Sequence, residues 1–438
     1  AEARFLRGFY YFELKRLWNS VPYVDEKVGY GQGIEKVANT PAFWDKIEAD
    51  FKHAYDNLPE THSDAGRANK WAAGAMLGKV YVYQAKWADA KAILTTVITS
   101  GKTTNGKKYG LVPKFAEIFN AENDNNEEAV FAMQSSMNTG STNNANGFDD
   151  LNYPYNTGAD GPGNCCGFFQ PTFSMANAYR TVGGLPILTE QADGTPDYNL
   201  PANAVKNDYG VNSTAAFTED ADPLDPRIDH TIGRRGIQYL DWIEHPGANW
   251  IRSQVYAGPY SPKKYVYYKR QENTLTDGSG WTRGYATMNF NIIRFADVLL
   301  LAAEAEIEAG SLTTALGYIN QIRNRAANPD GFVMKGGKAE ANYQIKPYTA
   351  FANKAEATAA LRMERLLELA TEGHRFFDLV RWGIASKTLN AYLKYESKWL
   401  VTKFGGAKYT TGKDEYLPIP QAQIDIQGSS VLKQNPGY

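Results

Sequence analysis

One segment of the chain, residues 234–283, places many large aromatic rings beside hydrogen-bonding side chains. Trp and Tyr in loops rich in Gly and Pro are costly to expose unless they contact a ligand. A flat ring can stack on the apolar C–H face of a sugar while neighbouring polar groups bind the sugar's hydroxyls. We therefore predict a ligand-binding site formed by Tyr239, Asp241, Trp242, Asn249, Trp250, Arg252, Tyr256 and Trp281.

The same rings could instead pack the loop region onto the rest of the molecule. We expect packing for Tyr265 and Tyr267, because they fall in a predicted short strand at 265–269. Trp242 and Trp250 each lie beside turn-forming or acidic residues, a setting that suits binding anchors as well as core residues. For these two rings, binding and packing remain open alternatives.

A second aromatic stretch surrounds the two cysteines of the chain, Cys165 and Cys166. Adjacent cysteines can close a vicinal disulfide, a rigid apolar plate that would suit a sugar face in an oxidising location. The geometry of such a disulfide is strained, so we expect two reduced thiols. Two cysteines alone form neither a disulfide framework nor a four-ligand zinc site. The rings of this stretch are Phe148, Tyr153, Tyr155, Phe168 and Phe169.

Carboxylates suited to acid–base catalysis occur in the segment 364–382, but their spacing favours a structural role. Glu364 and Glu368 could act as a general acid and a general base. At positions i and i+4 of a helix they face the same way and alternate with arginines, a pattern typical of ion pairs between helices. The five histidines form no HExxH motif, and the sequence has neither a GxSxG elbow nor a Walker loop. We predict no catalytic residue and no enzymatic activity.

Oxygen-bearing side chains alternate at Glu122, Asp124, Asn126 and Glu128, faintly like a calcium loop. The turn glycine and the distal glutamate of an EF-hand are missing, so we expect a solvated polar loop and no cofactor. Whether a structural calcium ion binds elsewhere stays open.

The charge balance and the hydropathy pattern exclude two classes of protein. The 46 Lys and Arg residues nearly match the 48 Asp and Glu residues, giving a net charge of -2. A nucleic-acid-binding protein would normally carry a basic excess on one face, so we predict no nucleic-acid partner. The sequence also lacks an apolar run of about eighteen residues, which a membrane-spanning helix needs.

Helices at both ends of the chain must position the loops in its middle. Apolar spacing predicts helices over 3–18, 41–57 and 356–382. Small residues lie twelve positions apart in two places, Gly78 with Ala90 and Ala303 with Ala315. This spacing is typical of tetratricopeptide helix pairs, where small residues let two helices approach closely.

Between these helical parts the composition becomes rich in Gly, Asn, Asp and Pro, which predicts long loops. Short strands such as 129–134 are also predicted there. We predict a mainly α fold in which tetratricopeptide-like helix pairs form a superhelical scaffold and a loop-rich mixed region is inserted in the middle. The predicted parts are a helical part at 1–126, a loop-rich part at 127–289 that binds the ligand, and a second helical part at 290–438. We expect the two helical parts to pack as one body.

Motifs spread over nearly the whole chain carry a family likeness. No single motif is decisive, but the ordered set resembles the SusD/RagB family. The motifs are ARFLRGFYYF at 3–12, DPR at 225–227, NIIRFADVLL at 291–300, INQIRNR at 319–325, EGHRFFDL at 372–379 and QNPGY at 434–438.

The resemblance implies a nutrient-binding lipoprotein of the outer membrane, exposed on the cell surface. Such proteins sit as a hinged lid over a SusC-like TonB-dependent transporter, capture glycans and hand them to the barrel. We expect the chain to begin after a segment that carries the lipidated cysteine and part of the ligand platform. The alternatives are a peptide or glycoprotein ligand with the same fold and partner and, more distantly, a glycoside hydrolase.

Overall fold

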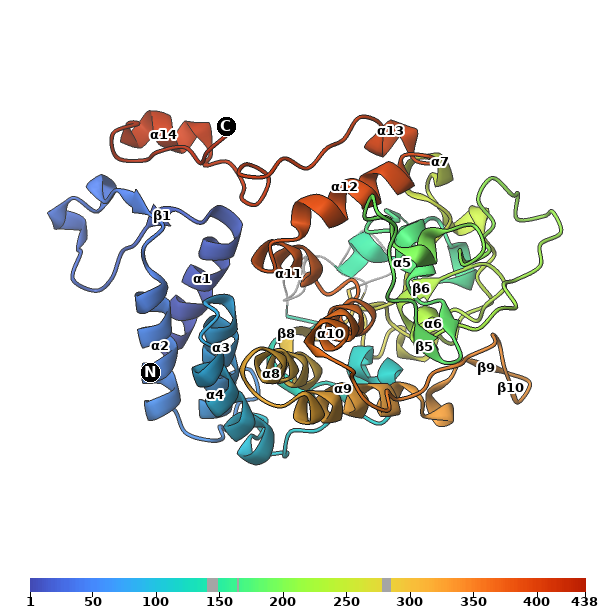
Figure 1. The fold of residues 1–438 in the computed structure, drawn as a ribbon, viewed down its shortest axis with the longest axis horizontal. Coiled ribbons are helices and arrows are strands. Elements are labelled where there is room, and N and C mark those ends of the chain that lie inside the picture. The colour runs from blue at the N-terminus through green and yellow to red at the C-terminus, as the bar shows by residue number, and fades with distance from the viewer. Residues whose placement is uncertain (140–148, 164, 278–284) are drawn as a thin grey trace.

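The computed structural model describes residues 1–139, 149–163, 165–277 and 285–438, which form a helical body and a loop-rich region (Figure 1). The helices are α1 (Glu2–Trp18), α2 (Trp44–Asn57), α3 (Lys70–Tyr83), α4 (Trp87–Ser100), α5 (Phe173–Asn177), α6 (Ile228–Thr231), α7 (Gln254–Ala257), α8 (Phe295–Ala309), α9 (Leu312–Ala326), α10 (Lys354–Glu368), α11 (Arg375–Arg381), α12 (Ala385–Glu396), α13 (Val401–Phe404) and α14 (Gln421–Gln427). Short antiparallel pairs are formed by β1 (Val21–Pro22) with β2 (Asn39–Thr40), β3 (Ala129–Met133) with β8 (Phe290–Arg294), β4 (Thr181–Val182) with β5 (Leu185–Pro186), β6 (Ile232–Gly233) with β7 (Ser261–Pro262), and β9 (Met334–Lys335) with β10 (Lys338–Ala339).

The helical body is built by packing each helix against the next. α1 packs on α2, α2 on α3 and α3 on α4; α4 then packs on α8, which also contacts α9 and α10. The chain thus passes from its first helices to its last through the α4–α8 contact, and the loop-rich region lies to one side (Figure 1). This arrangement confirms the predicted mainly α scaffold with a mixed region inserted in the middle.

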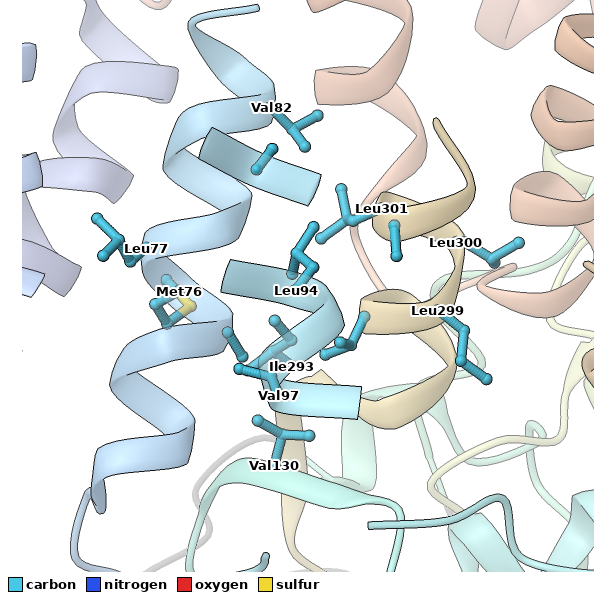
Figure 2. Packing of buried hydrophobic residues seen from close by; sticks show 14 of the residues in the cluster. Met76, Leu77, Val82, Leu94, Val97, Val130, Ile293, Leu299, Leu300 and Leu301 are labelled. Atoms are coloured by element: carbon cyan, nitrogen blue, oxygen red, sulfur yellow. The ribbon is translucent and has the colours of Figure 1, made fainter. Parts of the chain in front are cut away.

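Small residues set the distance between paired helices, as their spacing in the sequence predicts. A Cβ atom on Gly78 would lie 2.4 Å from Leu94 Cδ2, closer than packed carbon atoms can approach. In the second pair, Ala303 of α8 and Ala315 of α9 are both fully buried. Leu94 and its α4 neighbour Val97 lie between α3 and α8 in the core (Figure 2). Burying a leucine of this kind contributes about 2 kcal/mol.

The pair of β3 with β8 attaches the loop-rich region to α8. Phe131 of β3 pairs with Ile293 of β8, and Phe295 N at the start of α8 donates to Glu128 O at 2.8 Å. The predicted strand at 129–134 is therefore confirmed. The strand predicted at 265–269 is wrong, because Tyr265 has a φ of 59°, a left-handed conformation that breaks an extended segment.

Two helices differ from their predicted bounds. The helix expected over 41–57 starts at Trp44, because Thr40 pairs with Val21 in the β1–β2 ladder. The helical block expected over 356–382 is divided into α10 and α11. Thr371 and Gly373 between them have φ values of 63° and 82°, so the helix cannot continue through this turn.

A buried ion-pair network joins the loop-rich region to α9 and α10. Glu364 pairs with Arg227 at 2.6 Å and with Arg323 at 3.0 Å, and Glu368 pairs with Arg294 at 2.7 Å. These contacts confirm the structural role predicted for the two glutamates. The network balances five cations with five anions: Arg227, Lys264, Arg294, Arg323 and Arg325 with Glu128, Asp225, Glu364, Glu368 and Glu372.

Glu368 of this network stays ionised although it is buried. Burial by itself would raise the pKa of Glu368, but Arg325, Arg294 and Arg227 outweigh it and hold that pKa well below its usual range. Removing one partner of a buried pair leaves an uncompensated charge and typically costs about 3–5 kcal/mol. The network therefore fixes how the middle of the chain sits on the helices.

The C-terminal segment returns to the first helix. It runs from α13 to α14 across the molecule and ends near β1 (Figure 1). Leu417 N donates to Leu17 O at 2.8 Å, and Asn435 Nδ2 donates to Trp18 O at 2.8 Å. The C-terminal segment is thus tied to the end of α1 by main-chain acceptors on that helix.

Candidate functional site

Three of the rings predicted to bind a ligand lie in the core. Tyr239 is fully buried, and Trp242 and Trp250 are 6% and 4% exposed. The Tyr239 and Trp250 rings meet edge to face with centroids 5.5 Å apart, and Trp242 packs in the same way on Tyr267 at 5.7 Å. Trp242 Nε1 also donates to Tyr267 O at 3.1 Å. A stacking role for these three rings is therefore contradicted, because protein atoms cover the faces that a sugar would need.

Of the other predicted site residues, one already has hydrogen-bond partners within the protein and three are exposed to solvent. Asp241 accepts hydrogen bonds from the backbone of Lys269 at 2.5 Å and Arg270 at 3.2 Å, so it braces a turn. Asn249, Arg252 and Tyr256 are exposed, Tyr256 by 53%. Trp281 lies outside the described residues. Among the described residues, the partners of Arg252 are Tyr155, Cys166 and Phe168 of the cysteine stretch and not the buried tryptophans.

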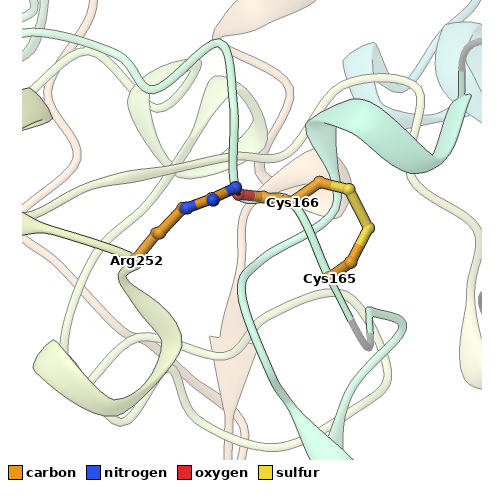
Figure 3. The surroundings of a disulfide bond; sticks show 3 residues. All are labelled: Cys165, Cys166 and Arg252. Carbon is orange, nitrogen blue, oxygen red and sulfur yellow. A yellow bond between two sulfur atoms is a disulfide. The ribbon is translucent and has the colours of Figure 1, made fainter.

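Arg252 lies over two aromatic rings of the loop that contains the cysteines. The carbon of its guanidinium is 5.1 Å from the Phe168 centroid and 5.8 Å from the Tyr155 centroid. Its Nη1 donates to Cys166 O at 3.3 Å, as Figure 3 shows. Phe168 is 45% exposed, so this cation–π arrangement faces solvent. We call Tyr155, Cys165, Cys166, Phe168 and Arg252 the loop patch.

A disulfide joins Cys165 to Cys166 at the centre of the loop patch (Figure 3). The expectation of two reduced thiols is therefore wrong. The chain accommodates the adjacent bridge in a loop where Cys166, Gly167 and Phe169 all have positive φ, at 75°, 62° and 56°. Such values are rare outside glycine and persist only where the surroundings hold them, as they often do at ligand sites.

The buried rings form the support beneath this loop. Tyr155 N donates to Trp250 O at 2.9 Å, and Gly167 N donates to Tyr153 O at 3.1 Å. A Cβ atom on Gly161 would lie 2.7 Å from the Trp250 ring, so the loop chain passes directly against that ring. The aromatic cluster predicted as the site thus positions the exposed patch from below.

A hollow of about 250 Å³ adjoins the loop patch on the side of Phe169. Phe169 is 67% exposed at its border. Lys264 lies in its wall and donates to Glu372 at 2.7 Å. Burial lowers the pKa of Lys264 to about 8, against the opposing effect of Glu372. The other lining residues are Asn152, Pro262, Tyr265, Phe290, Thr371 and Gly373.

The oxygen-bearing residues at 122–128 diverge toward different partners. Glu122 pairs with Arg270 at 3.0 Å, and Asp124 accepts a hydrogen bond from Asn289 N at 3.1 Å. Glu128 belongs to the buried network. Within the described ranges, no cluster of three or more His, Cys, Asp or Glu side chains could hold a metal ion.

Two family models match the chain. Residues 127–438 match the model of the SusD family, and residues 1–82 match a model described as starch-binding and associating with the outer membrane. The first match covers well over half of the chain. The chain belongs to the SusD family. The resemblance carried by the ordered motifs is thereby confirmed.

Known proteins similar to this SusD-family chain cover most of it at low identity. A SusD-like protein of Formosa agariphila is 25% identical over 396 residues, 88% of this chain and 63% of the relative. The starch-binding protein SusD of Bacteroides thetaiotaomicron is 24% identical over 466 residues, 100% of this chain and 72% of that protein. Among solved structures, the surface glycan-binding protein A of Bacteroides fluxus matches with a TM-score of 0.64 and 21% identity, covering 100% of this chain and 77% of that one.

This SusD-family chain spans less than two thirds of the length of its Formosa relative. Of the helices described, none has the length and apolar composition needed to cross a bilayer. The sequence did contain a signal for the loop patch, since Phe168 and Phe169 follow the cysteine pair after a single glycine in a loop-rich stretch. It was outweighed by the larger number of rings in the segment 234–283, most of which fill the core.

Proposed function

We propose that this SusD-family protein binds glycan at the loop patch. The observation that carries the proposal is the exposed Phe168 ring beside the Arg252 guanidinium. The ring offers an apolar face for the C–H side of a sugar, and the guanidinium offers donors for its hydroxyls. The disulfide between Cys165 and Cys166 fixes the loop before a ligand arrives, which reduces the entropy lost on binding.

Two further exposed rings, Phe169 and Tyr256, lie close in the sequence to residues of the loop patch. Phe169 follows Phe168 directly and borders the hollow beside Lys264. Tyr256 lies on α7, and Lys403 Nζ lies 5.4 Å from the centre of its ring. A chain of sugars has several rings to present, so a row of separated aromatic faces suits it better than one deep cavity.

Binding without cleavage fits the carboxylates of the molecule better than glycoside hydrolysis does. A hydrolase needs two carboxyl groups flanking the bound sugar, one of them able to hold a proton. Glu364 and Glu368 are fully buried in ion pairs with arginines, where a bound sugar cannot reach them. We therefore propose a capturing role and no catalysis.

We further propose that the protein acts at the cell surface as a lipid-anchored partner of a SusC-like TonB-dependent transporter in the outer membrane. Membership of the family supports this role, as does the description of the model that matches residues 1–82. The partner is tested by isolating the tagged full-length protein from outer membranes in mild detergent. A TonB-dependent transporter in stoichiometric amount is expected, and its absence would contradict the partnership.

The glycan site is tested with a glycan array followed by titration calorimetry on the best ligand. Phe168→Ala and Arg252→Ala are each expected to weaken binding by about 1–2 kcal/mol, the usual scale for an aromatic or arginine anchor at an interface. The matched control is Tyr30→Ala, because Tyr30 is 91% exposed but lies between β1 and β2, outside the patch.

Three outcomes are distinguishable. Loss of affinity in both patch variants, with Tyr30→Ala unchanged, supports the proposal. Glycan binding that is equal in all three variants places the site elsewhere on the molecule. Binding of peptides or glycoproteins in place of glycans would replace the proposed ligand class and keep the fold and the partner.

A further inference from the structure

A second cavity, of about 310 Å³, lies among α5, α10, α11 and α12. No residue of the loop patch lines it. Its walls are mainly apolar and include Met175, Leu366, Phe376, Leu379 and Leu389. A cavity of this size is at the lower end of the range for small-molecule sites, and Phe376 at its border is 37% exposed, so the cavity communicates with solvent.

Arg375, the first residue of α11, brings a positive charge to this apolar cavity. Among the described residues its guanidinium makes one hydrogen bond, from Nη1 to Arg362 O at 3.3 Å, and its Cζ lies 5.8 Å from the Trp382 ring centre. In the part of the chain that the structure describes, no carboxylate lies within ion-pairing distance of it. A guanidinium has five N–H donors, so most of the donors of Arg375 remain available.

Two nearby arginines, Arg365 and Arg381, differ from Arg375 because carboxylates pair with them. Arg365 and Arg381 each pair with Asp378 at 2.8 Å, and Arg381 also pairs with Glu304. Asp378 is therefore already shared between two cations. Burial lowers the pKa of Arg375, whereas the pKa values of Arg365 and Arg381 are raised, because their carboxylates outweigh burial. A partly buried cation without a counter-ion is costly unless an anion joins it.

We propose that the cavity between α10 and α12 binds a small organic anion, a carboxylate with an apolar body, through Arg375. The carboxylate would accept two parallel hydrogen bonds from the guanidinium, the geometry that this pair of groups prefers. The apolar body would lie against Leu366, Phe376 and Leu389, where it would be removed from water.

The walls favour this class of ligand over two others. A sugar carries hydroxyls around its whole rim, and burying them against leucine and phenylalanine side chains without partners is unfavourable. An inorganic anion such as sulfate would satisfy Arg375 but leave the apolar walls uncovered. A medium-length fatty acid or an arylalkanoic acid satisfies both parts of the cavity, and the site is independent of the proposed glycan site.

The test uses octanoate, its neutral analogue octanamide, and sulfate, each titrated into the full chain by calorimetry. Octanoate is expected to bind about tenfold more tightly than octanamide, because the charged hydrogen bond to Arg375 is the stronger one, and sulfate is expected not to bind. Equal binding of octanoate and octanamide, or no binding of octanoate, would overturn the proposal.

Variants separate the site from general hydrophobic binding. Arg375→Gln is expected to abolish the preference for octanoate over octanamide, and Thr388→Trp, which fills the cavity, to abolish binding of both. The matched control is Arg362→Gln, since Arg362 lies 5.0 Å from the Trp382 ring that Arg375 also faces, yet it does not line the cavity. If Arg375→Gln fails to fold, Thr388→Trp alone tests the proposal. Octanoate binding that is retained in that variant would contradict it.

Discussion

Aromatic rings and arginines occur in two arrangements, one turned inward beneath the loop-rich region and one turned outward on it. Inward, Trp242 and Trp250 meet other rings edge to face, and Arg294 is surrounded by carboxylates. Outward, Phe168 is half exposed and Arg252 lies over ring faces. Among the residues that the structure describes, no carboxylate pairs with Arg252.

The difference shows that residue type alone does not separate a core from a binding surface. What separates them is whether the partners of each group are already present in the protein. The inward groups already have their partners within the protein, so they contribute to its stability. The outward groups retain an open ring face and open donors, so they can contribute to binding. Variants of the two sets should therefore change different measured quantities.

The largest effect is expected from the inward arginine. Arg294→Met leaves Glu128, Glu368 and Glu372 each short of a cation, so the free energy of unfolding should fall by about 5 kcal/mol, the upper end for a broken buried pair. Urea unfolding followed by circular dichroism measures it. The control is Arg270→Met, whose exposed pair with Glu122 should contribute less than about 1 kcal/mol. Similar losses in both variants would mean that the buried network adds nothing beyond a surface pair.

The next effect tests whether the inward rings are structural. Trp250→Ala removes a buried ring and should lower the free energy of unfolding by about 3–5 kcal/mol. Phe168→Ala, the outward counterpart, should change it by less than about 1 kcal/mol, because that side chain is half exposed. Thermal unfolding of both variants gives the comparison. A stable Trp250→Ala protein that had lost only glycan affinity would return Trp250 to the binding site.

The smallest effect concerns the bridge between Cys165 and Cys166. Mass spectrometry of the unreduced protein should find no free thiol. The double variant Cys165→Ser, Cys166→Ser frees the loop, so glycan affinity should fall about threefold through the added cost of ordering it. Calorimetry measures that change, and the unfolding temperature should stay close to that of the parent. Unaltered affinity would show that backbone hydrogen bonds alone hold the loop.

The sequence predicted the scaffold better than the site. The spacing of Gly78 and Ala90 follows directly from how closely two helices must approach, and Leu94 does occupy the space that Gly78 leaves. The i, i+4 spacing of Glu364 and Glu368 likewise places both carboxylates on one face of α10, although the arginines that pair with them come from other elements. Both features depend on positions along one helix or one helix pair, which periodicity records.

The outcome for the rings depended on contacts that periodicity does not record. Trp242 is buried because the Tyr267 ring and carbonyl meet it from a distant turn, and the left-handed φ of Tyr265 makes that turn. The redox state of Cys165 and Cys166 depended on a backbone path that only the folded loop supplies. For Trp242 the deciding partner lies 25 residues away in the sequence.

The return of the C-terminal segment to α1 also constrains the order in which the molecule can assemble. Trp18 and Asn435 lie near opposite ends of the sequence, so their contact closes a loop of nearly the whole chain. Closing such a loop carries a high entropic cost, and contacts of this kind form late. The clasp formed by Asn39, Trp18, Lys433 and Asn435 should therefore be the last part of the fold to close and the first to open under a force applied to either end.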